Sequence, residues 1–163
     1  MKFKSVVLYL FLILGVVGCQ SQVEKPAQNE RQAIVAERGG EVMPFDLERT
    51  THIFEKLDNG GRQQVISDDE DVAQIDLIRT HLVEETQQFS EGNFHDPAMI
   101  HGDNMAGLHE LMTGYNKISI EYTEIEQGGQ ILYTTDDPKL VSAIHSWFEA
   151  QVSDHGQHAQ EGQ

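Results

Sequence analysis

The sequence predicts an α+β domain in which a duplicated ββα unit forms a four-stranded antiparallel sheet with helices on one face. Strand-like runs occur in pairs, and a helical pattern follows each pair, over residues 50–90 and again over residues 117–155. The two copies also share one spacing. Gly60-Gly61 and Asp68-Asp69 recur 68 residues later as Gly128-Gly129 and Asp136-Asp137. Matching turns, caps and helices in both halves indicate a duplication.

The first unit begins with a hairpin. Thr50–Leu57 and Arg62–Ser67 are strand-like, and Asn59-Gly60 between them favours the positive φ angles of a tight turn. Ser67 and Glu70 have the spacing of a capping box, so a helix is expected to follow to about Ser90. The apolar face of this helix comprises Ile75, Ile78, Leu82 and Phe89.

The second unit repeats this plan. Lys117–Glu126 and Gln130–Thr135 are predicted strands around a Gln127-Gly128-Gly129 turn, and Asp136-Asp137-Pro138 opens the helix. Its apolar face comprises Leu140, Ile144, Trp147 and Phe148. Residues 91–116 form an insertion between the units, with short helical turns around Gly102. One domain is therefore expected over residues 43–156, with a polar tail over 157–163.

The N-terminal segment resembles a bacterial lipoprotein signal. Two lysines precede the apolar run Ser5–Val17, which is short for a membrane-spanning helix and ends at Gly18-Cys19. The resemblance implies removal of residues 1–18 and acylation of Cys19 with more than one chain, such as palmitate. The alternative is an uncleaved anchor or a buried free thiol.

The residue that follows Cys19 indicates the membrane in which the protein is expected to be anchored. Gln20 favours the outer membrane of the cell envelope, with the protein facing the periplasm. Residues 19–42, rich in Gln, Glu and Ala, are expected to form a flexible tether, of which Arg31–Arg38 could be a marginal helix without a wide apolar stripe. The lipid anchor would make the membrane a partner of the chain.

The charge balance limits the kinds of partner that the folded part is expected to bind. The chain has 11 Lys and Arg against 27 Asp and Glu, a formal net charge of −16. This acidity argues against nucleic acid and against an anionic membrane surface, and it is compatible with cations. A single Cys excludes an intrachain disulfide framework and a Cys-rich metal cluster.

Histidines are the main candidates for site chemistry. His52 lies on the first predicted strand, and His81 and His145 lie on the two predicted helices. Each helical His is followed four residues later by a Glu, Glu85 or Glu149. Residues four apart share a helix face, so each pair could chelate one metal ion.

The insertion adds a mixed donor set. His101 and Met105 bring imidazole and thioether, a combination that suits copper better than zinc or magnesium. We therefore expect a binding protein for copper, or another transition metal, rather than an enzyme, and predict no catalytic residues. The predicted metal ligands are His52, His81, Glu85, His101, Met105, His145 and Glu149.

A role without metal stays open. A His at the border of an apolar stripe commonly packs with one hydrogen bond, and Met at helical spacing commonly fills a core. The same residues would then belong to a structural or interaction module of the envelope, which would dock a protein partner or a second copy of the chain.

Residues 43–158 also resemble a family of small exported bacterial proteins. The matching residues are Met43-Pro44-Phe45-Asp46-Leu47, Thr51-His52, Gly60-Gly61, Ile78–Leu82, Ile100-His101-Gly102 with Met105, His145–Gln151 and Asp154-His155-Gly156. Members are often labelled aspartate carbamoyltransferase. That reaction needs a phosphate-holding loop at a helix N-terminus, whereas Arg49-Thr50-Thr51 leads into a strand. Carbamoyl transfer therefore ranks third, after metal binding and protein interaction.

Overall fold

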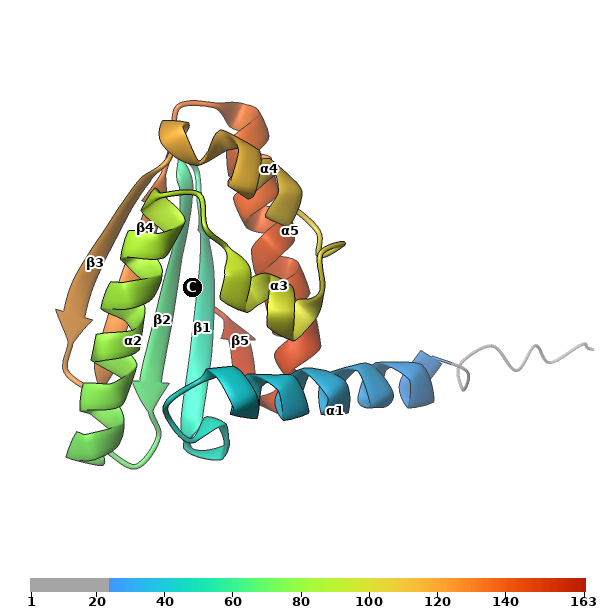
Figure 1. The fold of residues 1–163 in the computed structure, drawn as a ribbon, viewed down its shortest axis with the longest axis vertical. Helices are drawn as coiled ribbons and strands as arrows, with labels where there is room; N and C mark the ends of the chain where they lie inside the picture. Colours follow the sequence, from blue (N-terminus) through green and yellow to red (C-terminus); the bar gives the residue numbers. More distant parts are fainter. Residues whose placement is uncertain (1–23) are drawn as a thin grey trace, which may run out of the picture.

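The computed structural model describes residues 24–163 and has the predicted α+β class (Figure 1). Within these residues the chain forms five α-helices and one five-stranded sheet of order β3-β4-β2-β1-β5. The prediction of a four-stranded antiparallel sheet was wrong in one respect. The short strand β5 (Ala159–Glu161) pairs in parallel with β1, so the sheet is mixed.

The four predicted strands pair as two hairpins joined at the centre of the sheet. β1 (Thr50–Leu57) pairs with β2 (Gly60–Ser67), β3 (Ser119–Ile125) pairs with β4 (Gly128–Thr134), and β2 pairs with β4, all antiparallel. The two hairpins share one register. The pair Thr51 and Ile66 in the first corresponds, 68 residues later, to the pair Ser119 and Thr134 in the second.

Helices α2 (Val72–Ser90) and α5 (Pro138–His155) pack on the same face of this sheet. A Cβ atom on Gly61 would lie 2.4 Å from Phe148 of α5, and one on Gly129 would lie 3.0 Å from Leu82 of α2. The β2–β4 register places the two glycines on one face. The absence of side chains at both positions lets the helices approach the strands closely.

The N-cap of α2 is not the residue that the sequence predicted. Asp71, and not Ser67, is the N-cap residue, because its carboxylate accepts from the backbone N–H groups of Ala73 and Gln74. The Ser67 hydroxyl instead donates to Asp69. The cap of α5 is as predicted, with Asp137 accepting from the N–H of Lys139 and Pro138 in the first turn.

The expectation of a flexible tether was wrong for residues 24–42. They form helix α1 (Glu24–Val42), which contacts α3 (His95–His101) and α5. The contact stripe is narrow. Val35 is 1% exposed, Gly39 lies against Leu47, and Arg31 one turn before Val35 forms an ion pair with Asp154. A stripe of one valine, one glycine and one arginine has no recognisable apolar periodicity, which explains the error.

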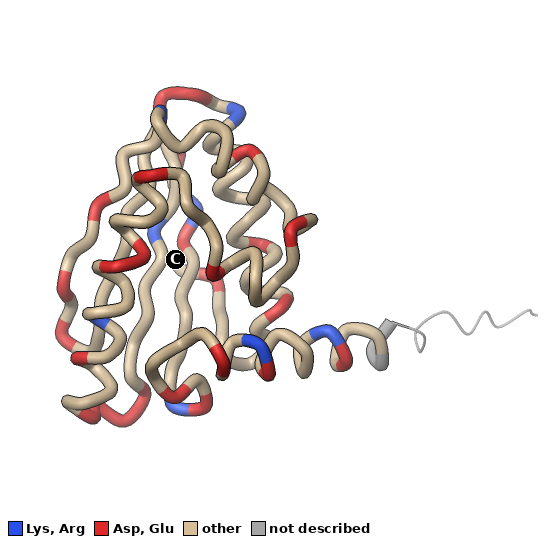
Figure 2. Tube along the Cα trace, viewed as in Figure 1, with Lys and Arg blue, Asp and Glu red and all other residues tan. Residues whose placement is uncertain are grey.

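Residues 157–163, predicted as a polar tail after the domain, contribute a strand to its sheet. Gly156–His158 form a short 3-10 helix that leads into β5, and backbone pairing with β1 orders these residues despite their polarity. The insertion contains α3 and α4 (Leu108–Gly114), and two further 3-10 turns lie at Leu47–Arg49 and Tyr115–Lys117. Acidic positions outnumber basic ones along the described chain (Figure 2).

One hydrophobic core lies between the sheet and its helices. It includes Phe89 and Phe94, whose rings stack 4.4 Å apart, and Trp147, which meets both edge-on. Among the residues described, no helix has the length and apolar character needed to cross a membrane. The predicted signal and Cys19 lie outside the described residues.

Candidate functional site

A small cavity lies between the sheet, α1, α2, α3 and the end of α5. It has about 40 Å³ of free space, enough for an ion or a few water molecules. Aromatic and aliphatic side chains form most of its wall, and polar groups converge on it from separate elements. The polar groups are His52, Gln63, His81, Glu85, His101, Gln151 and His155.

One group of donors forms around the start of α3. A nitrogen of His81 and one carboxylate oxygen each of Glu85 and Asp96 all lie within 4.8 Å of one another. His81 and Glu85 are buried on one face of α2, as their spacing predicts, and Asp96 comes from the first turn of α3. We refer to these three residues as the carboxylate cluster. It has the donor types of a transition-metal centre, one imidazole and two carboxylates.

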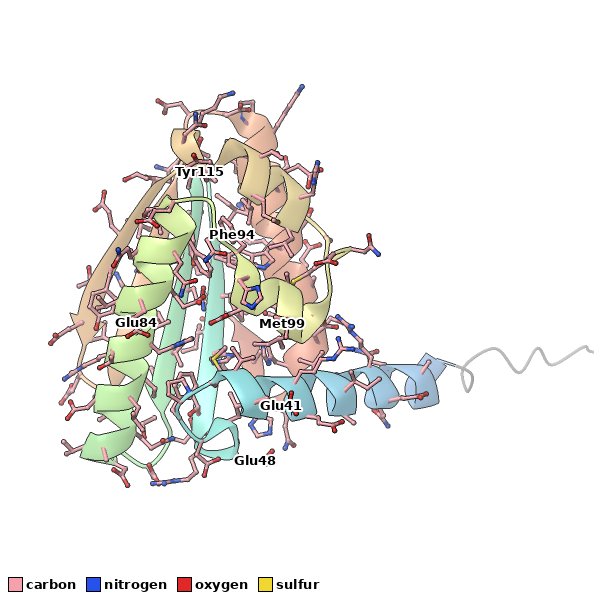
Figure 3. The ribbon with its side chains drawn as sticks, viewed as in Figure 1. Glu41, Glu48, Glu84, Phe94, Met99 and Tyr115 are labelled. Carbon is pink, nitrogen blue, oxygen red and sulfur yellow. The ribbon has the colours of Figure 1, made fainter. Side chains whose placement is uncertain are left out.

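Burial shifts the pKa values of two residues of the carboxylate cluster. It raises the pKa of Glu85 to about 9, and the nearby Asp96 carboxylate adds to this by repulsion and by a hydrogen bond. The same burial lowers the pKa of His81, against the attraction of Asp96 and Glu84. Without a cation, Glu85 is therefore protonated and His81 neutral at pH 7. Glu84, the neighbour on α2 labelled in Figure 3, is exposed to solvent.

A second group consists of three imidazoles. The ring of His155 lies between those of His52 and His101, at centroid distances of 4.9 Å and 5.0 Å. They come from α5, β1 and α3 respectively. We refer to these residues as the imidazole cluster. Phe45 adjoins both clusters, since its ring meets those of His52 and His81 edge-on.

Acidic and amide side chains orient two of these imidazoles. The Nδ1 of His101 donates to the Asp154 carboxylate at 2.8 Å, and Arg31 donates to the same carboxylate and to the backbone oxygen of His101. The Nε2 of His155 lies 3.1 Å from the Gln151 amide oxygen. Burial opposes ionisation of Asp154, but the hydrogen bonds from His101 and Arg31 lower its pKa to about 2. Asp154 is therefore an ionised acceptor.

His52 is the exception, because its buried Nδ1 has no hydrogen-bond partner among the described residues. An unpaired buried polar group costs about 1–3 kcal/mol. Burial, followed by the proximity of His101 and His81, lowers the pKa of His52 to about 4. Burial likewise lowers the pKa of His155 well below its ordinary value, with His52 and His101 adding to the effect. Both rings are therefore neutral at pH 7.

The structure brings together four of the seven predicted ligands. His52, His81, Glu85 and His101 line the cavity. His145 and Glu149 do not: the Nε2 of His145 donates to the backbone oxygens of Leu57 and Gly60 in the β1–β2 turn. Glu149 is exposed and pairs with Lys56.

Met105 does not line the cavity either. It is 8% exposed and belongs to the hydrophobic core, so the thioether at the cavity wall is that of Met43. Sequence reasoning missed Asp96 and Asp154 as site residues. Asp96 stands in the first turn of α3, where the helix dipole gives an acid an ordinary local explanation. Asp154 stands in the last turn of α5, where an acid opposes the dipole, and only the tertiary fold shows that His101 and Arg31 are its partners.

We compared the chain with known proteins in three ways. Scans against protein-family models, curated proteins and solved structures found no match for the chain.

Proposed function

We propose that this chain is a lipid-anchored binding protein of the cell envelope that holds a divalent transition-metal ion at the carboxylate cluster. The observation that carries the proposal is the convergence of His81, Glu85 and Asp96 donor atoms within 4.8 Å at a largely buried site. Two of these residues come from one helix and the third from the next, so the cluster depends on the tertiary fold.

The size and chemistry of the cavity support an ion over a larger ligand. Free space of about 40 Å³ is too small for a metabolite such as carbamoyl phosphate. Two neighbouring carboxyl groups repel each other when ionised, and a divalent cation would replace that repulsion with attraction. One nitrogen and two oxygen donors suit zinc and its neighbours in the first transition row.

The preference for copper depended on Met105, which lies away from the cavity. An N/O site still binds Cu²⁺ more tightly than Zn²⁺, in the general order of divalent affinities. Both ions are therefore suitable probes, and the binding function is proposed for a divalent transition metal as a class.

Calorimetric titration of the full-length chain in detergent, after treatment with a chelator, tests the proposal. We expect Zn²⁺ and Cu²⁺ to bind the wild-type chain, and Glu85→Gln or Asp96→Asn to weaken one binding event at least tenfold. Glu84→Gln is the matched control, because it removes a neighbouring exposed carboxylate from the same helix. Equal affinities for Glu85→Gln and the wild type would end the proposal.

We also propose that the two halves of the domain derive from a duplicated ββα unit, and that the two copies have diverged at the positions that face the cavity. The shared hairpin register supports the duplication. At the equivalent positions of the second half, 68 residues on, Ile120 replaces His52 and Glu149 replaces His81. Different residues at equivalent positions are typical of copies that diverged after duplication.

Protein interaction is the second candidate, favoured by the sheet face opposite α2 and α5. By strand alternation this face carries Ile53, Ile66 and Leu132, which are half-buried, among polar side chains. A partner docked there would be lost on Leu132→Glu substitution, whereas metal binding would not change. Cross-linking in intact cells with and without this substitution separates the two candidates.

A further inference from the structure

We infer that the carboxylate cluster forms an open metal centre, which binds a small monatomic or linear anion on the metal ion and holds it through Gln63. The inference rests on the metal binding proposed above and adds a ligand to the same site. Within residues 24–163, His81, Glu85 and Asp96 are the one group of three His, Cys, Asp or Glu residues whose ligand atoms lie within 4.8 Å of one another. The chain thus supplies three donors, whereas zinc is typically four-coordinate.

The cavity lies on the side from which a further ligand can reach the ion. His81 and Glu85 line the cavity, and Asp96 from α3 does not. An ion bound by all three residues therefore borders the cavity, and its remaining ligand has to come from there. Three protein ligands and one open position are typical of zinc centres that bind water or a substrate, whereas structural zinc centres are closed by protein ligands.

The size and walls of the cavity limit this ligand. Free space of about 40 Å³ accommodates water, fluoride or azide on the ion, but not a tetrahedral oxyanion such as sulfate. Much of the wall is apolar, formed in part by Phe45, Phe54, Phe89 and Trp147. An anion without partners would be costly to bury between such walls, so it needs both the cation and a hydrogen-bond donor.

Gln63 of β2 provides this donor. Its side chain lines the cavity, and its amide oxygen accepts a hydrogen bond of 3.0 Å from the hydroxyl of Tyr133. Because the oxygen is engaged in this way, the amide is oriented and its Nε2 is left to donate. Burial and, next, the charge of Glu85 raise the pKa of Tyr133 well above its ordinary value, so the Tyr133 hydroxyl and Gln63 lie near the carboxylate cluster. Tyr133 is a positioning residue that acts through Gln63.

Azide titration of the Cu²⁺-loaded full-length chain in detergent, after gel filtration has removed unbound copper, tests the inference. We expect a saturable azide-to-copper charge-transfer absorption, which fluoride suppresses by competition and sulfate does not. Gln63→Leu is expected to weaken azide binding about tenfold and to leave the affinity for Cu²⁺ unchanged. Gln64→Leu is the matched control, because Gln64 is the next residue of β2 and points to the opposite sheet face, where it pairs with Gln130.

A double-mutant cycle tests the role of Tyr133. Tyr133→Phe leaves Gln63 without its hydrogen bond, so we expect weaker azide binding at an unchanged affinity for Cu²⁺. The double variant Gln63→Leu with Tyr133→Phe is expected to bind azide as Gln63→Leu does, since Tyr133 acts only through Gln63. Additive losses of azide affinity in the double variant would contradict this positioning role.

The outcomes separate this inference from the proposed function. Copper that the wild type retains and Glu85→Gln loses, without an azide-dependent absorption, would overturn the open centre and leave the metal site. No copper retained by the wild type, or an equal azide absorption in Glu85→Gln, would overturn both. Equal azide affinities for Gln63→Leu and the wild type, or competition by sulfate, would overturn the inference alone.

A spectroscopic measurement on the wild type does not depend on how the variants fold. Pulsed electron paramagnetic resonance of the Cu²⁺-loaded chain in deuterated water is expected to show strongly coupled deuterons of a water molecule bound to the ion. Addition of azide should remove this coupling. A signal from distant solvent alone, unchanged by azide, would show that the centre has no position for an external ligand.

Discussion

The carboxylate of Asp154, in the last turn of α5, accepts a hydrogen bond of 2.8 Å from the Nδ1 of His101, at the end of α3. Arg31 of α1 donates to the same carboxylate, so one acid joins three helices beside the imidazole cluster. This three-way contact gives α1 its specific attachment to the domain.

Arg31→Ala should loosen α1 without unfolding the domain. Arg31 is partly exposed, so we expect a loss of about 1 kcal/mol in the free energy of unfolding. Amide hydrogen exchange should quicken along α1 while β2 and β4 keep their protection. Arg38→Ala is the control, because within residues 24–163 the one hydrogen bond of Arg38 to another helix is long, at 3.5 Å. Equal exchange rates in α1 of both variants would contradict this role.

Glu85 should make the metal-free protein less stable as the pH rises. Its folded pKa of about 9 exceeds the ordinary value of 4.5, so the folded state keeps a proton that the unfolded state releases. The free energy of unfolding should therefore fall between about pH 4.5 and pH 9, by up to ~1.4 kcal/mol per pH unit. Denaturant titrations in a chelator should show a shallower slope for Glu85→Gln. Glu84→Gln should retain the wild-type slope.

His52 should make the metal-free protein less stable as the pH falls. Its folded pKa of about 4 lies below the ordinary 6.5, so the unfolded state takes up a proton that the folded state excludes. Stability from this residue is present above pH 6.5 and is lost as the pH falls toward 4. His52→Phe should reduce this loss in chelator-treated samples, and His109→Phe, at an exposed position, should not. An unchanged acid slope in His52→Phe would refute the assignment.

Asp71 should stabilise α2 as its N-cap. Asp71→Ala removes the acceptor of two helix N–H groups, and we expect it to cost about 1 kcal/mol in the free energy of unfolding. Asp76→Ala removes the same charge from an exposed position inside the helix, where alanine is a good helix former. Thermal unfolding of the two variants should therefore differ, with Asp71→Ala the less stable.

Cys19→Ser should abolish lipid attachment. The chain has a single Cys, so labelling of cells with a fatty-acid analogue reports on this residue alone. We expect the wild type to carry label and partition with the outer membrane, and Cys19→Ser to remain unlabelled and unprocessed. Label on Cys19→Ser, or none on the wild type, would contradict the lipoprotein prediction.

Local patterns were reliable where the cause of structure is local. Asn59-Gly60 and the alternation of strand residues located both hairpins, and Asp137-Pro138 located the start of α5. Helix α1 was missed because its stability comes from contacts with α3 and α5 rather than from its own periodicity.

The site was only partly predictable for the same reason. His81 and His145 have the same local signal, a Glu four residues later on a helix. The first faces the cavity, and the second donates to backbone oxygens of the β1–β2 turn. Whether such a His faces the cavity or the β1–β2 turn depends on where its helix crosses the sheet. The imidazole cluster joins residues 52, 101 and 155, and no sequence spacing predicts such a long-range meeting.

For the anchor proposed at Cys19, the helical state of residues 24–42 alters how far the domain could reach from the membrane. A coil of 19 residues would let it wander through a broad volume, whereas 19 residues of helix form a rod roughly 28 Å long. The rod is fastened to α3 and α5 beside the imidazole cluster. A force applied at the N-terminal end of α1 would therefore be transmitted to the wall of the cavity.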